Sequence, residues 1–566
     1  MKKDEEGKEE ATIASLFAVL EDSNTRDTKE IKETSPKPLL TLLDRRSQLR
    51  QFTNLIRSQT FQRNHARRLF TPLLPILQKI IDDEKHVPQS AYHDNSDDND
   101  DGGNDFPLSK RQIDTNIEIK PDLASSEALR FMKYCALFLR AYLSNLKERR
   151  HEKNRKTCKM HSILEEVWNV AELLHDALFS LNSCGIEGMA VQRTISSVCE
   201  EYWHGQFTDR EMLVTQLVPL LVLKSLDGNA IKADIKRLWD IRDALSLLDF
   251  QDETISYLRN LLLRTISSPL YLKNVEGRKL ISFLFQLDDS DTAAFIQDLH
   301  LAVRDHVPLA NKATLEAYGD IYYRAWKCFQ LKRALSSDYP ETIEAEESNE
   351  LDRIQKSFEE NVFQNLMYSV LHVSAPMAKS IRIILQALHE RKKEPEIDQL
   401  LYKMYGPLLW RALAAANPSV RINASYILSA TFPLHDPTIP GTPGKKHLKD
   451  MVQKSVESLM SLLQDSNPKV RVASSSATVQ ILGVYWDALP IKYIRSLLNA
   501  IVMQHASDAS SALVRAQSIN GITFLLEVPA SHGVLRPLLP YIGNLIHDVT
   551  ERVRLAVVKM LITVSK

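Results

Sequence analysis

The sequence has little glycine, no long apolar run and almost no net charge. It contains 16 glycines in 566 residues, well below the roughly 7% that is usual, which favours helices over turn-rich sheets. The longest apolar run, Leu217–Leu223, includes Pro219 and is far shorter than the ~20 residues of a membrane span. The 71 basic and 72 acidic residues leave a formal charge of −1, so any contact with nucleic acid requires a local patch.

The cysteines do not form a recognisable framework. There are five, an odd number, they are widely spaced, and no C-x-x-C pair occurs, which argues against both disulfides and a zinc site and fits a reducing compartment. They are Cys135, Cys158, Cys184, Cys199 and Cys328. The first residues run directly into acidic side chains without an apolar segment, so we expect no secretory signal and a nuclear or cytoplasmic protein.

Motifs that carry catalysis or bind metals and cofactors are missing. The Gly441–Lys446 stretch has the wrong spacing for a phosphate-binding loop, and neither G-x-S-x-G nor H-E-x-x-H occurs. His161 lies three residues after Cys158, but no second pair follows at zinc-finger distance. The aspartate-rich segment Asp94–Asp105 lacks the final glutamate of a calcium loop. We therefore predict no catalytic residue, no metal site and no cofactor.

Hydrophobic spacing divides the chain into four regions. Residues 1–45 are predicted to be a disordered tail, 46–86 a pair of N-terminal helices, and 87–126 an acidic disordered loop. Residues 127–566 show one helical pattern after another and no strand pattern. Because 566 residues far exceed the ~100 to 200 of one compact domain, we expect a repeat array in the last region.

An internal repeat is clearest in residues 397–566. Four segments end in Val-Arg, at Arg421, Arg471, Arg515 and Arg554, at intervals of 50, 44 and 39 residues. HEAT units have a period of ~40 to 47 residues, so the pattern predicts an all-α HEAT-repeat α-solenoid, an armadillo-like superhelix. We expect the first helix of each hairpin at Ile397–Ala416, His447–Leu463, Ile491–Met503 and Val534–Ile546, and a loop at Pro433–Gly444.

Aspartates precede three of these arginines at nearly constant spacing. Asp465 and Asp548 lie six residues before Arg471 and Arg554, Asp508 lies seven before Arg515, and Arg421 has no such partner. This spacing resembles the HEAT consensus, in which the two side chains form a ladder that links successive repeats. We predict a structural role for these seven residues, with ligand binding as the alternative.

Two basic clusters and one threonine are the remaining functional candidates. The first cluster has seven cations in thirteen residues, at Lys147, Arg149, Arg150, Lys153, Arg155, Lys156 and Lys159; the second consists of Lys445, Lys446 and Lys449. Each is interpreted either as an exposed helix end or as a nuclear-import signal or DNA phosphate contact. Thr442 begins a Thr-Pro-x-Lys sequence within the expected loop, so it is a candidate phosphorylation site for a proline-directed mitotic kinase.

Several long runs of residues 210–566 resemble one family of HEAT proteins. They are Arg237–Phe250, Ser268–Phe285, Tyr318–Trp326, Pro407–Arg421 and Phe432–Pro437, and they look like the G-type non-SMC subunits of the condensin II complex. The resemblance implies a nuclear, chromosomal, non-catalytic subunit that acts in mitotic chromosome condensation. Its implied partners are a kleisin segment, the SMC heterodimer of the complex and DNA, with no membrane and no small-molecule substrate.

The resemblance leaves one alternative and one departure. A nuclear transport or adaptor scaffold that binds protein partners without DNA would show the same repeats, because repeats alone do not mark a ligand. The family's chains are considerably longer, whereas this sequence stops at Lys566 in the second helix of a hairpin. We therefore expect either a truncated or a divergent form, with a stacking face left exposed.

Overall fold

The computed structural model describes residues 36–43, 46–58, 60–85, 126–153, 163–250, 252–287, 294–338 and 345–565. Within these ranges the regular elements are helices, and no β-strand occurs. The predicted all-α fold is confirmed. The chain forms two compact units, Met1–Leu261 and Leu262–Lys566, and α11 (Ser256–Thr265) spans the boundary in the sequence.

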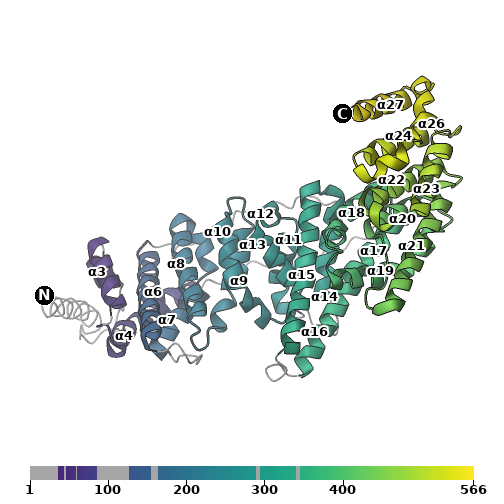
Figure 1. The fold of residues 1–566 in the computed structure, drawn as a ribbon. Coiled ribbons are helices and arrows are strands. Elements are labelled where there is room, and N and C mark those ends of the chain that lie inside the picture. The colour runs from purple at the N-terminus through teal and green to yellow at the C-terminus, as the bar shows by residue number, and fades with distance from the viewer. Residues whose placement is uncertain are drawn as a thin grey trace, which may run out of the picture. The chain divides into compact units, whose positions relative to one another are not determined.

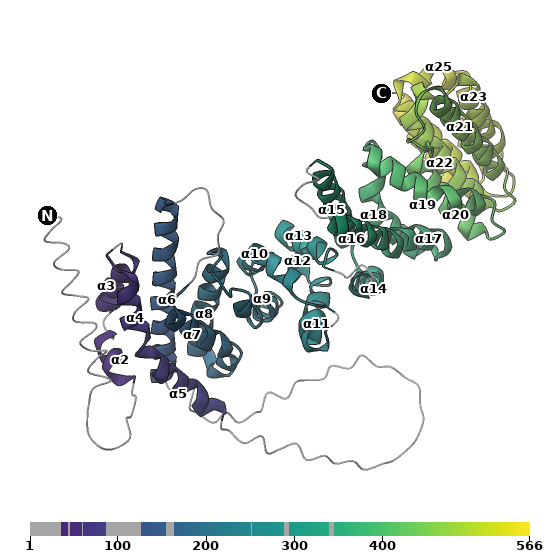
Figure 2. The same ribbon diagram turned by 90° about the horizontal axis from the view of Figure 1, so that it is seen from below.

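The first unit is built around the long helix α6 (Ser126–Lys153). Phe131, Phe138 and Tyr142 of α6 are buried because helices pack on several sides of it, chiefly α3 (Arg46–Arg57) and α8 (Gly185–His204) (Figure 2). The other α-helices described in this unit ahead of α11 are α2 (Lys37–Leu43), α4 (Arg63–Phe70), α5 (Leu73–Lys85), α7 (Glu165–Asp176), α9 (Leu217–Ser225) and α10 (Lys232–Asp240).

The prediction of a disordered tail is wrong for Lys37–Leu43, which forms helix α2. Its Leu39, Leu40 and Leu43 are buried, and the helix packs on α3 and α6. The burial of three leucines explains why this short stretch is ordered despite its polar surroundings in the sequence. The rest of the tail up to residue 35, and residues 87–125 of the acidic loop, lie outside the described residues.

The first half of the second unit is built around the longest helix described there. α15 (Lys312–Asp338) packs along α18 (Ala375–His389) and against α13 (Val275–Leu284). Around them lie α12 (Pro269–Lys273), α14 (Ala294–His306), α16 (Ala345–Phe358), the π-helix η6 (Glu359–Gln364) and α17 (Asn365–His372). Trp326 of α15 is buried in this region and donates through Nε1 to Glu359, at 3.0 Å.

The second half consists of stacked hairpins. Four second helices, α20 (Pro418–Thr431), α22 (Pro468–Tyr485), α24 (Ala512–Leu526) and α27 (Glu551–Val564), pack each on the next (Figure 1). The first helices of three hairpins are α19 (Pro395–Leu413), α21 (Gly441–Leu463) and α23 (Ile491–Asn499), which continues as the π-helix η8 (Ala500–His505). This is the arrangement expected of HEAT units.

The sequence at each turn explains where the second helices begin. Asn417 and Asn467 accept hydrogen bonds from the backbone N–H groups of Ser419 and Lys469, both at 2.9 Å. Each asparagine is followed by a proline in the first helical turn, where the missing N–H has no cost. The Asn-Pro pair therefore sets the start of α20 and α22.

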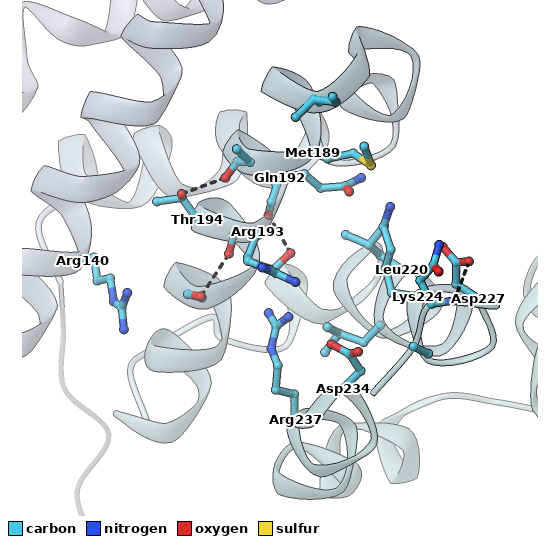
Figure 3. Close-up of a pocket in the computed structure, with 17 residues that line it drawn as sticks. Arg140, Met189, Gln192, Arg193, Thr194, Leu220, Lys224, Asp227, Asp234 and Arg237 are labelled. Atoms are coloured by element: carbon cyan, nitrogen blue, oxygen red, sulfur yellow. Dashed lines mark hydrogen bonds between the residues drawn. The ribbon is translucent and has the colours of Figure 1, made fainter. Parts of the chain in front are cut away.

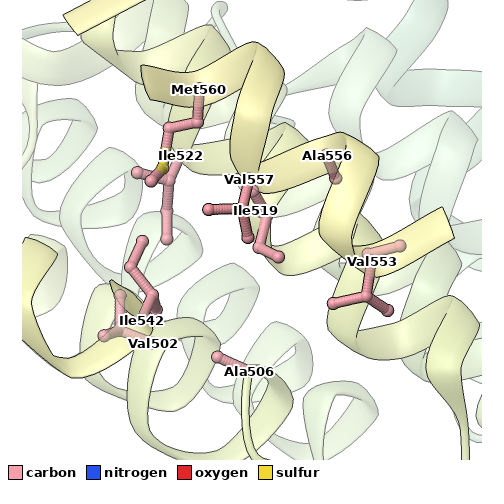
Figure 4. Packing of buried hydrophobic residues seen from close by; sticks show 10 residues of the cluster. Val502, Ala506, Ile519, Ile522, Ile542, Val553, Ala556, Val557 and Met560 are labelled. Carbon is pink, nitrogen blue, oxygen red and sulfur yellow. The ribbon is translucent and has the colours of Figure 1, made fainter. Parts of the chain in front are cut away.

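The prediction of one continuous helix at Val534–Ile546, as the first helix of the fourth hairpin, is wrong. The chain forms α25 (His532–Leu535), α26 (Leu539–Gly543) and the 3₁₀ turn η10 (Asn544–His547) because Pro537 and Pro540 interrupt the helical hydrogen bonds. Packing is nevertheless retained. Ile542 lies in one apolar cluster with Ile519 of α24 and Val557 of α27 (Figure 4).

The loop expected at Pro433–Gly444 is also shorter than predicted. α21 begins at Gly441, whose φ is +69°, a value that favours glycine. A Cβ on Gly444 would lie 2.0 Å from the carbonyl oxygen of Ile439, so this first turn closes tightly only with glycine. The two glycines extend the helix into the predicted loop.

Candidate functional site

Three of the arginines singled out in the sequence join successive repeats. Arg421 donates through Nε and Nη2 to the two carboxylate oxygens of Asp465, at 2.7 and 2.9 Å. Arg515 makes the same pair of bonds to Asp548, at 2.7 and 3.0 Å. Arg471 donates through Nε to Asp508, at 2.9 Å. Each arginine thus binds the aspartate of the following repeat, in the geometry that suits a guanidinium and a carboxylate.

The same arginines also hold the turn of their own repeat. Nη1 of Arg471 donates to the carbonyl oxygens of Asp465 and Ser466, at 2.7 and 3.1 Å. Nη1 of Arg515 donates to that of Asp508, at 2.7 Å. Since one guanidinium fixes both its own turn and the next repeat, these side chains are committed to stacking and have little capacity left for a ligand.

The ladder aspartates also accept backbone hydrogen bonds. Asp465 accepts from the N–H of Asn467 at 2.8 Å, and Asp548 from that of Thr550 at 2.8 Å. Burial raises the pKa of Asp465, but its bonds from Arg421 and Asn467 outweigh burial, so that pKa lies below the usual value. The hydrogen bond from Arg515 lowers the pKa of Asp548. Both carboxylates are therefore charged at neutral pH.

One further ion pair of the ladder type was not predicted from the sequence. Arg278 of α13 donates through Nε to Asp320 of α15, at 2.7 Å, and through Nη1 to the carbonyl oxygen of Leu272, at 2.8 Å. These are the two contacts of a ladder arginine. Asn274 stands four residues before Arg278, as Asn417 does before Arg421, so the Asn-x3-Arg spacing could have revealed it.

The first basic cluster is only partly described. Lys147 is exposed on α6, whereas Arg149 donates through Nη2 to the carbonyl oxygen of Phe61, at 2.8 Å, and is thus a packing residue. Arg150 and Lys153 belong to the last turns of α6, with side chains outside the described set. Arg155, Lys156 and Lys159 lie outside the described residues altogether.

The second basic cluster lies at the start of α21. Lys445, Lys446 and Lys449 are all exposed there. Farther along the same helix, the Nζ atom of Lys454 lies 4.4 Å from the ring centroid of Trp410 on α19. Lys454 and Trp410 border a 330 Å³ pocket between α19 and α21, together with Tyr402, Lys403, Gly406, Pro407, His447 and Met451. The structure thus extends the lysine cluster along α21.

Thr442 occupies the first turn of α21 and is exposed. It therefore does not lie in a loop, as the sequence suggested. Its side chain is at the positive end of the helix dipole, where a phosphate group would be stabilised. Lys445 and Lys446 follow at three and four residues, on adjacent positions of the helix surface.

The first unit contains a larger pocket of 650 Å³ between α8, α9 and α10 (Figure 3). Glu200 of α8 is paired with Arg237 of α10, and the adjacent Glu201 with Arg140 of α6 at 2.6 Å. These pairs tie α8 to its neighbours on both sides. Arg193 of α8 is exposed at the pocket. Sequence reasoning missed this site because its charges come from separate helices.

The described ranges contain no group of three or more metal-ligating side chains that could hold an ion. Within the same residues, no helix is both long and apolar enough to cross a membrane. The buried histidines have other partners, such as His300, whose Nδ1 lies 2.9 Å from the hydroxyl of Tyr322.

Comparison with known proteins supports the resemblance seen in the sequence. Residues 264–436 match a family described as "Condensin II non structural maintenance of chromosomes subunit". The chain is 31% identical over 373 residues to "Condensin-2 complex subunit G2" of Xenopus laevis, covering 66% of this chain and 30% of that protein. The Mus musculus protein of that name is 28% identical over 409 residues, which are 71% of this chain and 33% of the relative.

The resemblance to the G-type subunits of condensin II is confirmed. Most of the runs quoted from the sequence fall within or at the edge of the matched 264–436 segment. The chain spans about a third of the length of the curated relatives it matches. Among solved structures, that of Kap121p is 10% identical with a TM-score of 0.26, covering 98% of this chain and 53% of that one. A TM-score this low does not establish a shared fold, so the all-α fold class rests on the helices of this chain.

Proposed function

We propose that this chain is a non-catalytic subunit of a condensin II complex, because residues 264–436 match the family of condensin II non-SMC subunits. In this proposal it acts on chromosomes in the nucleus during mitotic condensation. The SMC heterodimer supplies the ATPase, while this chain binds the kleisin subunit and DNA. The family match is the observation that carries the proposal.

The exposed faces of the first helices support a role in DNA binding. α21 exposes Lys445, Lys446, Lys449 and Lys454 against two acidic residues, Asp450 and Glu457. α23 exposes Lys492 and Arg495 and contains no acidic residue. These two neighbouring helices therefore present an excess of positive charge, which suits the phosphate backbone and reads no base sequence.

The second helices carry a surface of a different kind. Val484 of α22 is 73% exposed and Phe524 of α24 is 44% exposed. Apart from the ladder arginines, the only charged side chain in α22 and α24 is Lys469. An apolar and weakly charged surface suits a polypeptide segment better than DNA. We therefore assign the kleisin segment to α22 and α24, and DNA to α21 and α23.

The two assignments are tested by variants that affect one surface each. Replacing Lys445, Lys446 and Lys449 by glutamate should reduce the slope of log K against log salt for duplex DNA by about 0.9 for each phosphate that the protein no longer neutralises. The matched control replaces three exposed lysines elsewhere in the second unit by glutamate, namely Lys312, Lys356 and Lys379. We expect this control to keep the slope of the parent chain. An unchanged slope in the first variant would refute the DNA surface.

The kleisin surface has its own variant. Val484→Glu with Phe524→Glu should weaken binding of the purified kleisin subunit at least tenfold while leaving the DNA salt slope unchanged. The control pair Ile491→Glu with Tyr541→Glu places the same charges on exposed residues of the first-helix side, and should bind kleisin normally. Equal kleisin binding by the parent chain, the variant and the control would refute the assignment of the kleisin segment to α22 and α24.

The alternative is a nuclear transport or adaptor scaffold that does not contact DNA. Localisation separates the two. A fluorescently tagged chain should concentrate on chromosomes in dividing cells, and the concentration should depend on the SMC subunits. A chain that stays at the nuclear envelope and leaves mitotic chromosomes unlabelled would favour the transport scaffold.

A further inference from the structure

The 330 Å³ pocket between α19 and α21 is lined by aromatic rings. Tyr402 and Trp410 of α19 are both half-buried there. The ring of His447, on α21, lies nearly perpendicular to that of Tyr402, with centroids 5.9 Å apart and an interplanar angle of 89°. The volume is near the lower end of the ~300 to 1,000 Å³ of small-ligand sites, so the pocket admits one flat group and not a helix.

The space is open because residue 406 is a glycine. A Cβ at Gly406 would contact only the ring of Tyr402, at 3.7 Å, which is an ordinary van der Waals distance. A larger side chain at this position would therefore extend into the pocket without displacing the backbone. Glycine in a helix interior is less stable than alanine, so helix stability alone does not favour this residue.

Two polar groups at the pocket have unused hydrogen-bonding capacity. Nε2 of His447 is buried and has no hydrogen-bond partner among the described residues. The imidazole lines the pocket, so a turn of the ring presents this nitrogen to a ligand. Pro407, inside α19, has no N–H, so the carbonyl oxygen of Lys403 lacks its usual helical donor. A ligand that carries donors and acceptors along one edge would match both groups.

Positive charge lies beside the aromatic rings. Nζ of Lys454 is 4.4 Å from the centroid of the Trp410 ring, and the exposed lysine cluster lies nearer the start of the same helix. Lys403 differs, because its Nζ donates to Glu359 at 2.8 Å. A lysine at an exposed site gains less from an aromatic ring than a stacked base does. A base therefore displaces Lys454 from the ring, and the ammonium group becomes free to bind the adjoining phosphate.

We propose that this pocket binds one unpaired base of single-stranded DNA. The base stacks on Trp410, and its edge forms hydrogen bonds with His447 and the carbonyl oxygen of Lys403. Lys454 and the lysine cluster of α21 bind the phosphates on either side of the base. The inference rests on the proposed DNA surface of α21, to which it adds a site for the base.

The shape and charge of the pocket favour a base over the two other ligands that the cations would attract. In a duplex the bases are paired and stacked on one another, so they do not reach a pocket of this kind. A phenylalanine, tyrosine or tryptophan of an acidic peptide offers at most one polar group on its ring. Its carboxylates must also occur at matching positions, whereas each nucleotide carries its own phosphate.

The test compares binding of a short oligothymidylate with binding of an abasic strand of equal length by the full chain. Trp410→Leu should weaken oligothymidylate binding at least about fivefold and leave binding of the abasic strand unchanged, since that strand has phosphates but no bases. Trp410→Phe should keep most of the affinity. Equal oligothymidylate binding by Trp410→Leu and the parent chain would overturn the proposal.

The matched control is Trp239→Leu. Trp239 is also half-buried, and the guanidinium carbon of Arg242 lies 4.4 Å from its ring centroid, but this tryptophan belongs to the first unit. The variant should bind both strands as the parent chain does. A loss of oligothymidylate binding equal to that of Trp410→Leu would show that the effect does not come from the pocket.

Gly406→Leu fills the pocket without removing a contact. Leucine forms helices more readily than glycine, so the thermal midpoint should not fall. The new side chain occupies the space of the base, so oligothymidylate binding should drop at least about fivefold, as in Trp410→Leu. Unchanged binding by a folded Gly406→Leu protein would contradict a base in this pocket.

Duplex DNA separates the inference from the proposed function. Both pocket variants should keep the duplex affinity and salt slope of the parent chain, whereas glutamates at Lys445, Lys446 and Lys449 lower that slope. A normal lysine effect on the duplex, with no effect of either pocket variant on the single strand, would refute the pocket alone. Tighter binding of oligouridylate than of oligothymidylate would assign the pocket to RNA, and a loss of kleisin binding alone would assign it to a peptide.

Discussion

Arg421 and Asp465 form a two-bond pair between successive repeats, with N···O distances of 2.7 and 2.9 Å. Both side chains are largely buried, with 14% and 10% of their surface exposed. Breaking such a pair leaves a guanidinium without its acceptor, which costs more than breaking a surface ion pair. The ladder therefore contributes to how firmly one hairpin is fixed on the next.

Asp465→Asn tests this contribution. The amide keeps the size of the side chain but removes the charge, so we expect the free energy of unfolding of the second unit to fall by about 2 kcal/mol. Urea denaturation followed by circular dichroism measures it. The control is Glu316→Gln, which breaks the exposed pair between Lys312 and Glu316 and should cost less than about 0.5 kcal/mol. Equal losses in the two variants would contradict a structural ladder.

Glu359 offers a second test, because three side chains use its carboxylate. It accepts from Trp326 Nε1 at 3.0 Å, Gln355 Nε2 at 2.8 Å and Lys403 Nζ at 2.8 Å. Glu359→Ala leaves the buried indole N–H unpaired and should cost about 2 to 3 kcal/mol. Glu359→Gln keeps an acceptor for Trp326 and should cost clearly less. Thermal unfolding of both variants gives the comparison, and equal losses would rule out the indole bond as the cause.

Two histidines predict the response to acid, His300, which is buried, and His389, which is half-buried. Burial lowers the pKa of both His300 and His389 to about 4, below the ~6.5 of an unfolded histidine. The unfolded chain then binds more protons between pH 6.5 and 4, so stability is complete above pH 6.5 and falls as the pH drops through this window. The loss is on the order of a few kcal/mol.

The variant His300→Gln removes one of these titrations. Its thermal midpoint should depend less steeply on pH between 6.5 and 4 than that of the parent chain, although its midpoint at pH 7.5 should be lower because the contact with Tyr322 is disturbed. His532→Gln, at an exposed histidine, should leave the slope as it is. A slope that His300→Gln does not change would assign the acid response to other groups.

Thr442 is predicted to be phosphorylated by a proline-directed kinase in mitosis. Phosphate in the first turn of α21 would be favoured by the helix dipole and would reduce the positive charge that Lys445 and Lys446 present. Thr442→Glu should therefore weaken DNA binding about two- to fivefold at low salt, and Thr442→Val should not. Mass spectrometry of mitotic material that finds only the unmodified peptide would contradict the prediction.

The sequence could predict those parts of the fold that rest on short-range patterns. The Asn-Pro turns and the Val-Arg steps indicated the second helices because both the cap and the apolar face lie within a few residues. Pro537 and Pro540 were visible as well, yet apolar spacing alone favoured one continuous helix. The structure follows the prolines, since a missing N–H outweighs a favourable stripe.

The rest depends on contacts between distant residues. The Asn-x3-Arg spacing marks Arg278 itself, but its partner Asp320 lies 42 residues away and inside a helix, so the acceptor could not be read from the local sequence. The pocket between α8, α9 and α10 collects Arg193 and Arg237 from separate helices, and neither is unusual in its own segment. The prolines and glycines of Pro433–Gly444 predict a loop around Thr442, whereas in the structure Gly441 and Gly444 lie in the first turn of α21.

The most direct test of the central claim is affinity purification of the tagged chain from nuclear extract of dividing cells, with the co-purified proteins identified by mass spectrometry. The account predicts recovery of a kleisin and of two SMC subunits in comparable amounts, retained after nuclease treatment, so that DNA is not the bridge. Recovery of nuclear import factors with neither kleisin nor SMC protein would contradict it.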